Sequence, residues 1–214
     1  ALMLMTMRRL GEGERHVRGG AWGGLRPTFM LGRTLRGKTL GIVGYGRIGR
    51  AVARQAAAAF DMKIIYHAPR EPRIDDPATA GPAGAERVDS LETLLARADV
   101  VSLHCPATPE TRHLMNARTL ALMPAHAYLV NTARGDVVDE AALASVLKER
   151  KIAGAGLDVY EFEPSVTAEL MELENVVLLP HLGSATIETR TNMGMRALSN
   201  LDSFVQTGSV SDPV

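Results

Sequence analysis

Short apolar runs alternate with longer stretches of helical spacing along most of this chain. The apolar runs are four or five residues long and carry few charges, which is typical of buried strands. We expect six strands, at residues 39–43, 63–66, 99–103, 127–130, 153–157 and 176–179. We expect helices at residues 1–10, 47–59, 90–96, 139–150 and 185–205, with Ser90 as an N-cap, and irregular chain at 11–33 and 68–85.

This alternation predicts an α/β fold. Strands that are apolar on both faces must be covered by helices on both sides, and a helix between consecutive strands makes those strands parallel. We therefore expect a doubly wound parallel sheet whose first strand–helix–strand unit runs over residues 39–66. Open sheets of this kind bind ligands beside the carboxyl ends of their strands.

Composition narrows the classes of partner. Lys plus Arg and Asp plus Glu both count 24 in 214 residues, so the net charge is zero and nothing favours nucleic acid. No apolar stretch approaches the roughly 20 residues that cross a membrane. Cys105 is the only cysteine, which excludes an intrachain disulfide and fits a reducing compartment. We expect a cytoplasmic protein without membrane contact, and we assign no metal site.

A glycine-rich motif, GYGRIG at residues 44–49, follows the first strand and opens the first long helix. In this context Gly44 can form a tight turn, Gly46 leaves room for a pyrophosphate, and Gly49 lets the helix pack on the strand. The helix N-terminus adds free N–H groups and a partial positive charge. A bare strand–helix turn is the alternative, but the context favours a dinucleotide site. Its expected residues are Gly44, Gly46, Arg47, Ile48 and Gly49.

The end of the second strand bears on coenzyme choice. An Asp or Glu about 20 residues after the glycines would hold the ribose hydroxyls of NAD, but His67 stands at that position. Arg70 and Arg73 follow it, and Arg70 could pair with a 2′-phosphate. These arginines could also form an ordinary solvated loop face. We expect NADP to be preferred, with NAD as the alternative coenzyme.

Three later motifs each follow a predicted strand: NTARG at 131–135, GLDVYEFEP at 156–164 and PHLGSAT at 180–186. Together they bring a cation, carboxylates and a histidine to the ligand-binding edge. Arg134 can hold a carboxylate with two parallel hydrogen bonds. His181 can donate a proton to a ketone oxygen, and Glu163 can stabilise its imidazolium form. Each residue alone has an ordinary explanation as a turn or capping residue, but their conjunction favours reduction of a 2-oxo acid.

These motifs resemble the D-isomer-specific 2-hydroxyacid dehydrogenase family. The likeness is carried by GKTLGIVGYGRIG, ADVVSLHCPATPETRHLM, LVNTARGDVVDEAAL, AGAGLDVYEFEP and LLPHLGSAT. The runs PTFMLGRTLRGKTLGIVG and IIYHAPR look most similar to the glyoxylate/hydroxypyruvate reductase branch, which often uses NADPH. The resemblance implies a Rossmann-type coenzyme domain and hydride transfer between NAD(P)H and a short 2-oxo acid. Which 2-oxo acid stays open.

The resemblance also implies roles for individual residues. It makes Arg134, Glu163 and His181 the catalytic trio. It implies that Asp158 holds the carboxamide group of the nicotinamide. The remaining residues implied to surround the coenzyme are Cys105, Pro106, Thr132, Ala133 and Gly183.

Family members carry a further, substrate-holding domain, most of which would precede this chain. We therefore expect a helix and arm for homodimerisation at 1–33, a dinucleotide-binding domain at 34–190, and a helix and tail at 191–214 that would return to the absent substrate domain. The chain by itself is expected to be inactive.

Two other functions stay open. Transcriptional corepressors of the same fold keep the trio and bind coenzyme as sensors, which would make this a binding protein instead of an enzyme. A purely structural, dimerising role is the other possibility. A substrate panel with NADPH and NADH separates these alternatives.

Overall fold

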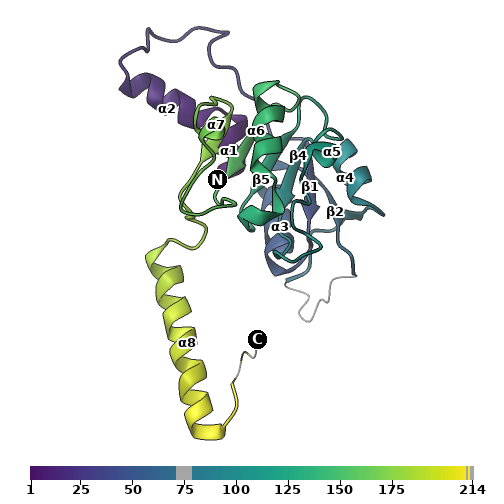
Figure 1. The fold of residues 1–214 in the computed structure, drawn as a ribbon, viewed down its shortest axis with the longest axis vertical. Coiled ribbons are helices and arrows are strands. Elements are labelled where there is room, and N and C mark those ends of the chain that lie inside the picture. Colours follow the sequence, from purple (N-terminus) through teal and green to yellow (C-terminus); the bar gives the residue numbers. More distant parts are fainter. Residues whose placement is uncertain (71–78, 211, 213–214) are drawn as a thin grey trace. The chain divides into compact units, whose positions relative to one another are not determined.

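The computed structural model describes residues 1–70, 79–210 and 212, and within them seven strands form one parallel sheet (Figure 1). The strands are β1 (Thr39–Val43), β2 (Lys63–His67), β3 (Glu86–Arg87), β4 (Val100–Leu103), β5 (Tyr128–Asn131), β6 (Gly154–Leu157) and β7 (Val176–Leu178). Their order is β3-β2-β1-β4-β5-β6-β7. The chain winds outward in one direction from β1 to β3, then returns to place β4 on the other side of β1. The predicted doubly wound α/β fold is confirmed.

Helices cover both faces of the sheet. The helices of the sheet-containing part are α1 (Leu2–Met7), α2 (Leu10–Arg18), α3 (Arg47–Phe60), α4 (Leu91–Arg97), α5 (Ala117–Leu120), α6 (Glu140–Lys148) and α7 (Ala168–Met171). Side chains of α1 and α3 pack with Leu40 and Ile42 in one apolar cluster. Side chains of α4 to α7 pack with Val101 and Leu129 in another. The two clusters use alternate residues of the strands, as the pleat requires.

The apolar N-terminal stretch packs on the sheet. Leu2 and Met7 of α1 are buried, and a Cβ placed on Gly156 would lie 2.6 Å from Oγ1 of Thr6 and 2.8 Å from Cγ of Leu2. The glycine therefore lets α1 lie directly against β6. This contact makes the first helix part of the core.

The expectation of irregular chain throughout residues 11–33 was wrong, because α2 occupies Leu10–Arg18. Its glycines disfavour a helix, but Arg9 pairs with Glu12 and Glu14 pairs with Arg18, at helical spacings of three and four. Between α1 and α2 the backbone of Arg9 adopts a left-handed conformation with φ 55°, which divides the single helix expected at 1–10. Local ion pairing thus compensates for only part of the low helical propensity of glycine.

The other expected elements formed with small shifts of their ends. Ser90 caps α4 as predicted, its Oγ accepting the N–H of Thr93 at 3.1 Å. The short elements β3, α5 and α7 were not predicted, because two to four residues are too few to show a period.

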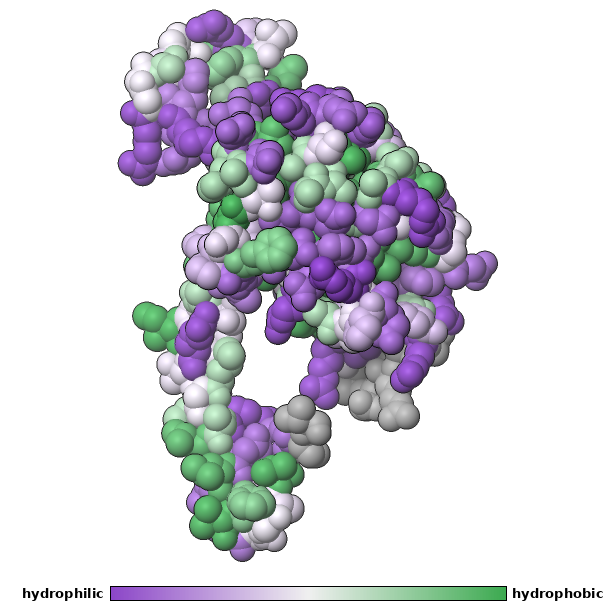
Figure 2. Space-filling view, viewed as in Figure 1, coloured by the Kyte–Doolittle hydropathy of each residue, from purple (hydrophilic) through white to green (hydrophobic). Residues whose placement is uncertain are grey.

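The chain divides into two compact units, residues 1–179 and 180–214. The second unit contains a turn followed by α8 (Ile187–Thr207), which is capped by Thr186 and ends at Gly208 in the left-handed conformation. No residue of α8 is buried, and apolar surface lies along this helix (Figure 2). Its exposed apolar side chains are Ile187, Met193, Met195, Leu198, Leu201, Phe204 and Val205. Among the described residues, no helix has the length and apolar character to cross a membrane.

Candidate active site at the carboxyl ends of the strands

The glycine motif forms a turn in which Gly44 and Gly49 leave no room for a side chain. Gly44 has φ +90°, and a Cβ there would lie 2.7 Å from the backbone N of Cys105 and from the backbone C of His104. A Cβ on Gly49 would lie 2.4 Å from the Gly44 carbonyl oxygen. Gly46 differs, because no atom lies within 4 Å of the position its Cβ would take. The turn is closed on the protein side and open on the side where a pyrophosphate would lie.

The start of α3 offers donors to that open side. Gly46 is the N-cap of this 14-residue helix, and no side chain caps it. Arg47 and Ile48 are exposed beside it. Uncapped N–H groups with the positive end of the helix dipole favour an anion. These residues fit the pyrophosphate of a dinucleotide.

The end of β2 presents cations at the corner expected to hold the adenosine ribose. The partly buried His67 donates from Nδ1 to the Val88 carbonyl at 3.2 Å. Arg70 is exposed three residues later. Arg87 of β3 donates from Nη2 to the Ala68 carbonyl at 3.2 Å, a contribution that the sequence pattern did not reveal. Arg73 lies outside the described residues.

The segment after β4 forms one wall of the expected coenzyme site, and its titratable side chains, His104 and Cys105, are uncharged near neutral pH. Burial lowers the pKa of His104 to about 4, and its Nε2 lies 2.9 Å from Oγ of Ser102. Burial raises the pKa of Cys105, so the thiol stays protonated near neutral pH. Pro106 is exposed, and its carbonyl accepts a hydrogen bond from Thr111 at 2.6 Å. This wall suits contact with a coenzyme better than nucleophilic chemistry.

A buried amide shapes the turn that carries Arg134. Asn131, at the end of β5, is 1% exposed; its Nδ2 donates to the Arg134 carbonyl at 2.9 Å, and its Oδ1 accepts the Ala133 N–H at 3.0 Å. Thr132 and Arg134 are consequently held on the exposed side of the turn. Asn131 was not predicted as a site residue, although a polar residue ending an apolar strand is a signal for such a role.

The loop after β6 packs against this turn. A Cβ on Gly135 would lie 1.8 Å from the carbonyl oxygen of Tyr160, so only glycine allows the two backbones to approach this closely. Asp158 is 4% exposed, and its N–H donates to the Asn131 carbonyl at 3.0 Å. Glu163 is exposed, and its Oε1 accepts the Tyr160 N–H at 3.0 Å. The segments that carry Arg134 and Glu163 are therefore in direct contact.

Tyr160 anchors that loop to the residue that follows β7. Its hydroxyl donates to the Leu179 carbonyl at 2.8 Å. Burial, together with the charges of Asp158 and Glu140, raises the pKa of Tyr160 to about 12. The phenol therefore acts as a fixed hydrogen-bond donor at physiological pH.

His181 and Gly183 belong to the second unit. His181 is exposed and its backbone has φ +54°, in a left-handed region that few residues other than glycine adopt. Its pairing with Glu163 would join the two units, and it stays a prediction.

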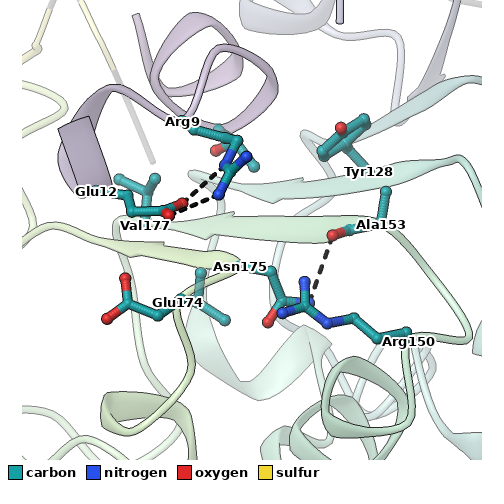
Figure 3. Close-up of a pocket in the computed structure, with 10 residues that line it drawn as sticks. Arg9, Glu12, Tyr128, Arg150, Ala153, Glu174, Asn175 and Val177 are labelled. Carbon is teal, nitrogen blue, oxygen red and sulfur yellow. Dashed lines mark hydrogen bonds and ion pairs between the residues drawn. The ribbon is translucent and has the colours of Figure 1, made fainter. Parts of the chain in front are cut away.

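A pocket lined partly by charged side chains lies away from these strand ends (Figure 3). This pocket of about 470 Å³ includes Tyr128 and Ala153, at the amino ends of β5 and β6. At its rim Arg9 points toward Glu12, three residues along the chain, and donates two hydrogen bonds to it, at 2.8 and 2.6 Å. Because this pocket lies at the amino ends of the strands and the candidate site at their carboxyl ends, we assign the pocket no part in the site. The described residues contain no cluster of three His, Cys, Asp or Glu side chains that could hold a metal.

Residues 1–183 match the protein family described as "D-isomer specific 2-hydroxyacid dehydrogenase, NAD binding domain". The chain belongs to this family. A glyoxylate reductase of Thermococcus litoralis is 49% identical in an alignment of 210 positions that covers 96% of this chain and 62% of that protein. A glyoxylate reductase of Aeropyrum pernix is 48% identical, over 96% of this chain and 61% of that protein. The chain thus spans about three-fifths of the length of these relatives.

A solved structure gives the same picture. The NADPH-dependent glyoxylate/hydroxypyruvate reductase of Sinorhizobium meliloti, in complex with NADP and malonate, superposes with a TM-score of 0.88 at 38% identity. The match covers 100% of this chain and 64% of that one.

Gly46→Ala tests the assignment of the glycine turn. The added methyl group meets open space, so the melting temperature should stay unchanged, while NADPH affinity should fall by about tenfold or more because the methyl occupies the pyrophosphate position. Calorimetric titration and thermal unfolding measure the two effects. Gly194→Ala, which also meets open space, is the matched control. Unchanged NADPH affinity in Gly46→Ala would contradict the assignment.

Proposed function

We propose that this protein reduces short 2-oxo acids to 2-hydroxy acids of the D configuration, with glyoxylate and hydroxypyruvate as the candidate substrates. The contact between the Arg134 turn and the Glu163 loop, at the sheet edge that also carries the glycine turn, is the main support. On this proposal the contact would bring a cation and a carboxylate to the side of the expected coenzyme cleft. The reductases among its relatives support the substrate class.

The chain's own groups match the needs of this reaction. The exposed guanidinium of Arg134 holds the substrate carboxylate and polarises the reacting carbonyl. His181 protonates the oxygen, and Glu163 supports the imidazolium form of that histidine. A bound reduced nicotinamide supplies the hydride. Asp158, Thr132 and Ala133 would hold its ring beside the substrate.

The coenzyme proposed is NADPH, with NADH used less well. His67 and Arg70 replace the acidic residue that would repel a 2′-phosphate, and Arg87 adds a further cation at the same corner. The relative from Sinorhizobium meliloti, which is NADPH-dependent, supports this preference.

A homodimer is proposed from the exposed apolar residues of the N-terminal region. Trp22, Leu25 and Leu31 are 58%, 95% and 65% exposed. Leaving such side chains in water is costly, and a twofold dimer is the commonest way to cover them.

Substitutions in the trio test the mechanism in the whole protein. His181→Ala should lower kcat by about 10²–10⁴-fold, the usual contribution of a positioned general acid. Arg134→Ala should raise KM and lower kcat together, because one guanidinium binds the carboxylate and polarises the carbonyl. In Glu163→Gln, the decline of the reduction rate with rising pH should begin at a lower pH than in the wild type, because the imidazolium form of His181 loses its stabilising carboxylate.

Steady-state glyoxylate reduction over a pH range measures all three. His126→Ala is the control, because His126 pairs with Asp99 at the other edge of the sheet. A wild-type rate in His181→Ala, or coenzyme binding without any turnover by the wild type, would reject the enzymatic proposal and favour a coenzyme sensor.

Coenzyme preference is tested by combining His67→Asp with Arg70→Ala. The wild type should show a higher kcat/KM with NADPH than with NADH, and the double variant should reverse the order because it adds a ribose-binding carboxylate and removes a phosphate partner. Arg118→Ala, at a cation that pairs with Glu92, should leave the ratio unchanged. An equal or higher kcat/KM with NADH in the wild type would overturn the preference.

Association is tested by sedimentation at micromolar concentration. The wild type should sediment as a dimer, and Trp22→Ala combined with Leu25→Ala should shift it toward the monomer by removing exposed apolar surface. Met171→Ala, at an exposed apolar residue of α7, serves as the control. A monomeric wild type would count against the dimer.

A further inference from the structure

A buried carboxylate holds the loop that carries Glu163. Glu140, the first residue of α6, is 2% exposed. Its Oε1 accepts the N–H of Glu161 at 2.7 Å, and its Oε2 accepts the N–H and the hydroxyl of Thr167 at 3.3 and 2.5 Å. These hydrogen-bond partners come from the two ends of one loop, residues 161–167.

Capping of α6 does not explain this carboxylate. Asp139 is the N-cap, and its Oδ1 accepts the N–H of Ala142 at 2.9 Å. Burying a charged group is costly unless hydrogen bonds compensate it. The loop supplies those bonds, and the positive end of α6 lies beside the carboxylate. Glu140 thus stabilises the loop more than its own helix.

Thr167 likewise bonds to Glu140 and does not cap its own helix. It is the N-cap of α7, where a threonine hydroxyl commonly accepts a backbone N–H of its own helix. Here no side-chain capping bond forms, and the hydroxyl donates to Glu140.

The loop is also fixed against the Arg134 turn. Its first end follows Tyr160, whose backbone contacts Gly135 and whose N–H binds Glu163. Within the loop, the N–H of Ser165 donates to the Phe162 carbonyl at 2.8 Å, which closes a turn around Glu163. With both ends held by Glu140, the position of Glu163 relative to the Arg134 turn is determined.

We propose that Glu140 is a positioning residue for the reduction, which fixes the loop at 161–167 so that Glu163 is presented correctly. This rests on the proposed role of Glu163. Glu140 itself touches neither substrate nor coenzyme in this proposal. Its loss should therefore change the chemical step and its pH dependence more than substrate binding.

Glu140→Gln in the whole protein tests the proposal, because the amide removes one of the two accepting oxygens at nearly constant size. We expect kcat for glyoxylate reduction to fall about tenfold, the order that misplacing a catalytic group produces, with KM changed less than about threefold. The decline of the reduction rate with rising pH should also begin at a lower pH than in the wild type, as expected for Glu163→Gln. Glu172→Gln, an exposed acid at the end of α7, is the matched control and should behave as the wild type.

Thr167→Ala and Thr167→Ser provide a second pair that leaves Glu140 in place. The alanine variant loses the hydroxyl donor and should lower kcat in the same direction, whereas the serine variant keeps the hydroxyl and should restore it. This pair keeps the test valid if Glu140→Gln fails to fold, as thermal unfolding will show.

A double-mutant cycle separates positioning from a general loss of stability. In a Glu163→Gln background, Glu140→Gln should have little further effect on kcat or on the pH profile. Equal effects in both backgrounds, or a wild-type profile in Glu140→Gln and Thr167→Ala, would overturn the positioning role alone. A wild-type rate and pH profile in Glu163→Gln itself would overturn the role of Glu163 and, with it, this inference.

Discussion

The close approach of two backbones at Gly135 and Tyr160 is the constraint on which the candidate site depends. A side chain at Gly135 would place its Cβ 1.8 Å from the Tyr160 carbonyl oxygen, a distance that no rearrangement of a side chain could relieve. Because of this contact, the turn after β5 and the loop after β6 pack together as one structural unit within residues 1–179. Arg134 is presented from one part of it and Glu163 from the other.

Buried polar groups maintain this unit from inside. Asn131 uses both ends of its amide to hold the turn, and Glu140 uses both oxygens to hold the loop. Each group is almost fully buried and would destabilise the fold if its partners were lost. The energetic need to satisfy these groups therefore gives the exposed residues beside them a defined position.

The coenzyme end of the sheet follows a different principle. At the glycine turn the absence of side chains matters, since Gly44 and Gly49 permit close packing and Gly46 leaves space. At the end of β2, the charges of Arg70 and Arg87 define the corner. Shape is therefore the basis of the proposed pyrophosphate site, whereas electrostatics is the basis of the proposed choice between NADP and NAD.

The sequence by itself determined the succession of strands and long helices along the chain and the position of the glycine turn, and it supplied the arginine, glutamate and histidine motifs on which the proposed chemistry rests. These depend on local periodicity and on residue types that each form of chemistry requires. It did not reveal α2, because the glycines of this helix argue against a helix and the ion pairs of Arg9 and Glu14 that favour one are weak local signals.

Only the tertiary structure decided which segments touch. Glu140 reads in the sequence as an ordinary helix-starting acid, and no local pattern marks Thr167. Their shared hydrogen bonds link positions 27 residues apart, and no local pattern encodes such a contact. The packing of the sheet and its helices brings them together, because a buried carboxylate must find donors wherever the fold supplies them.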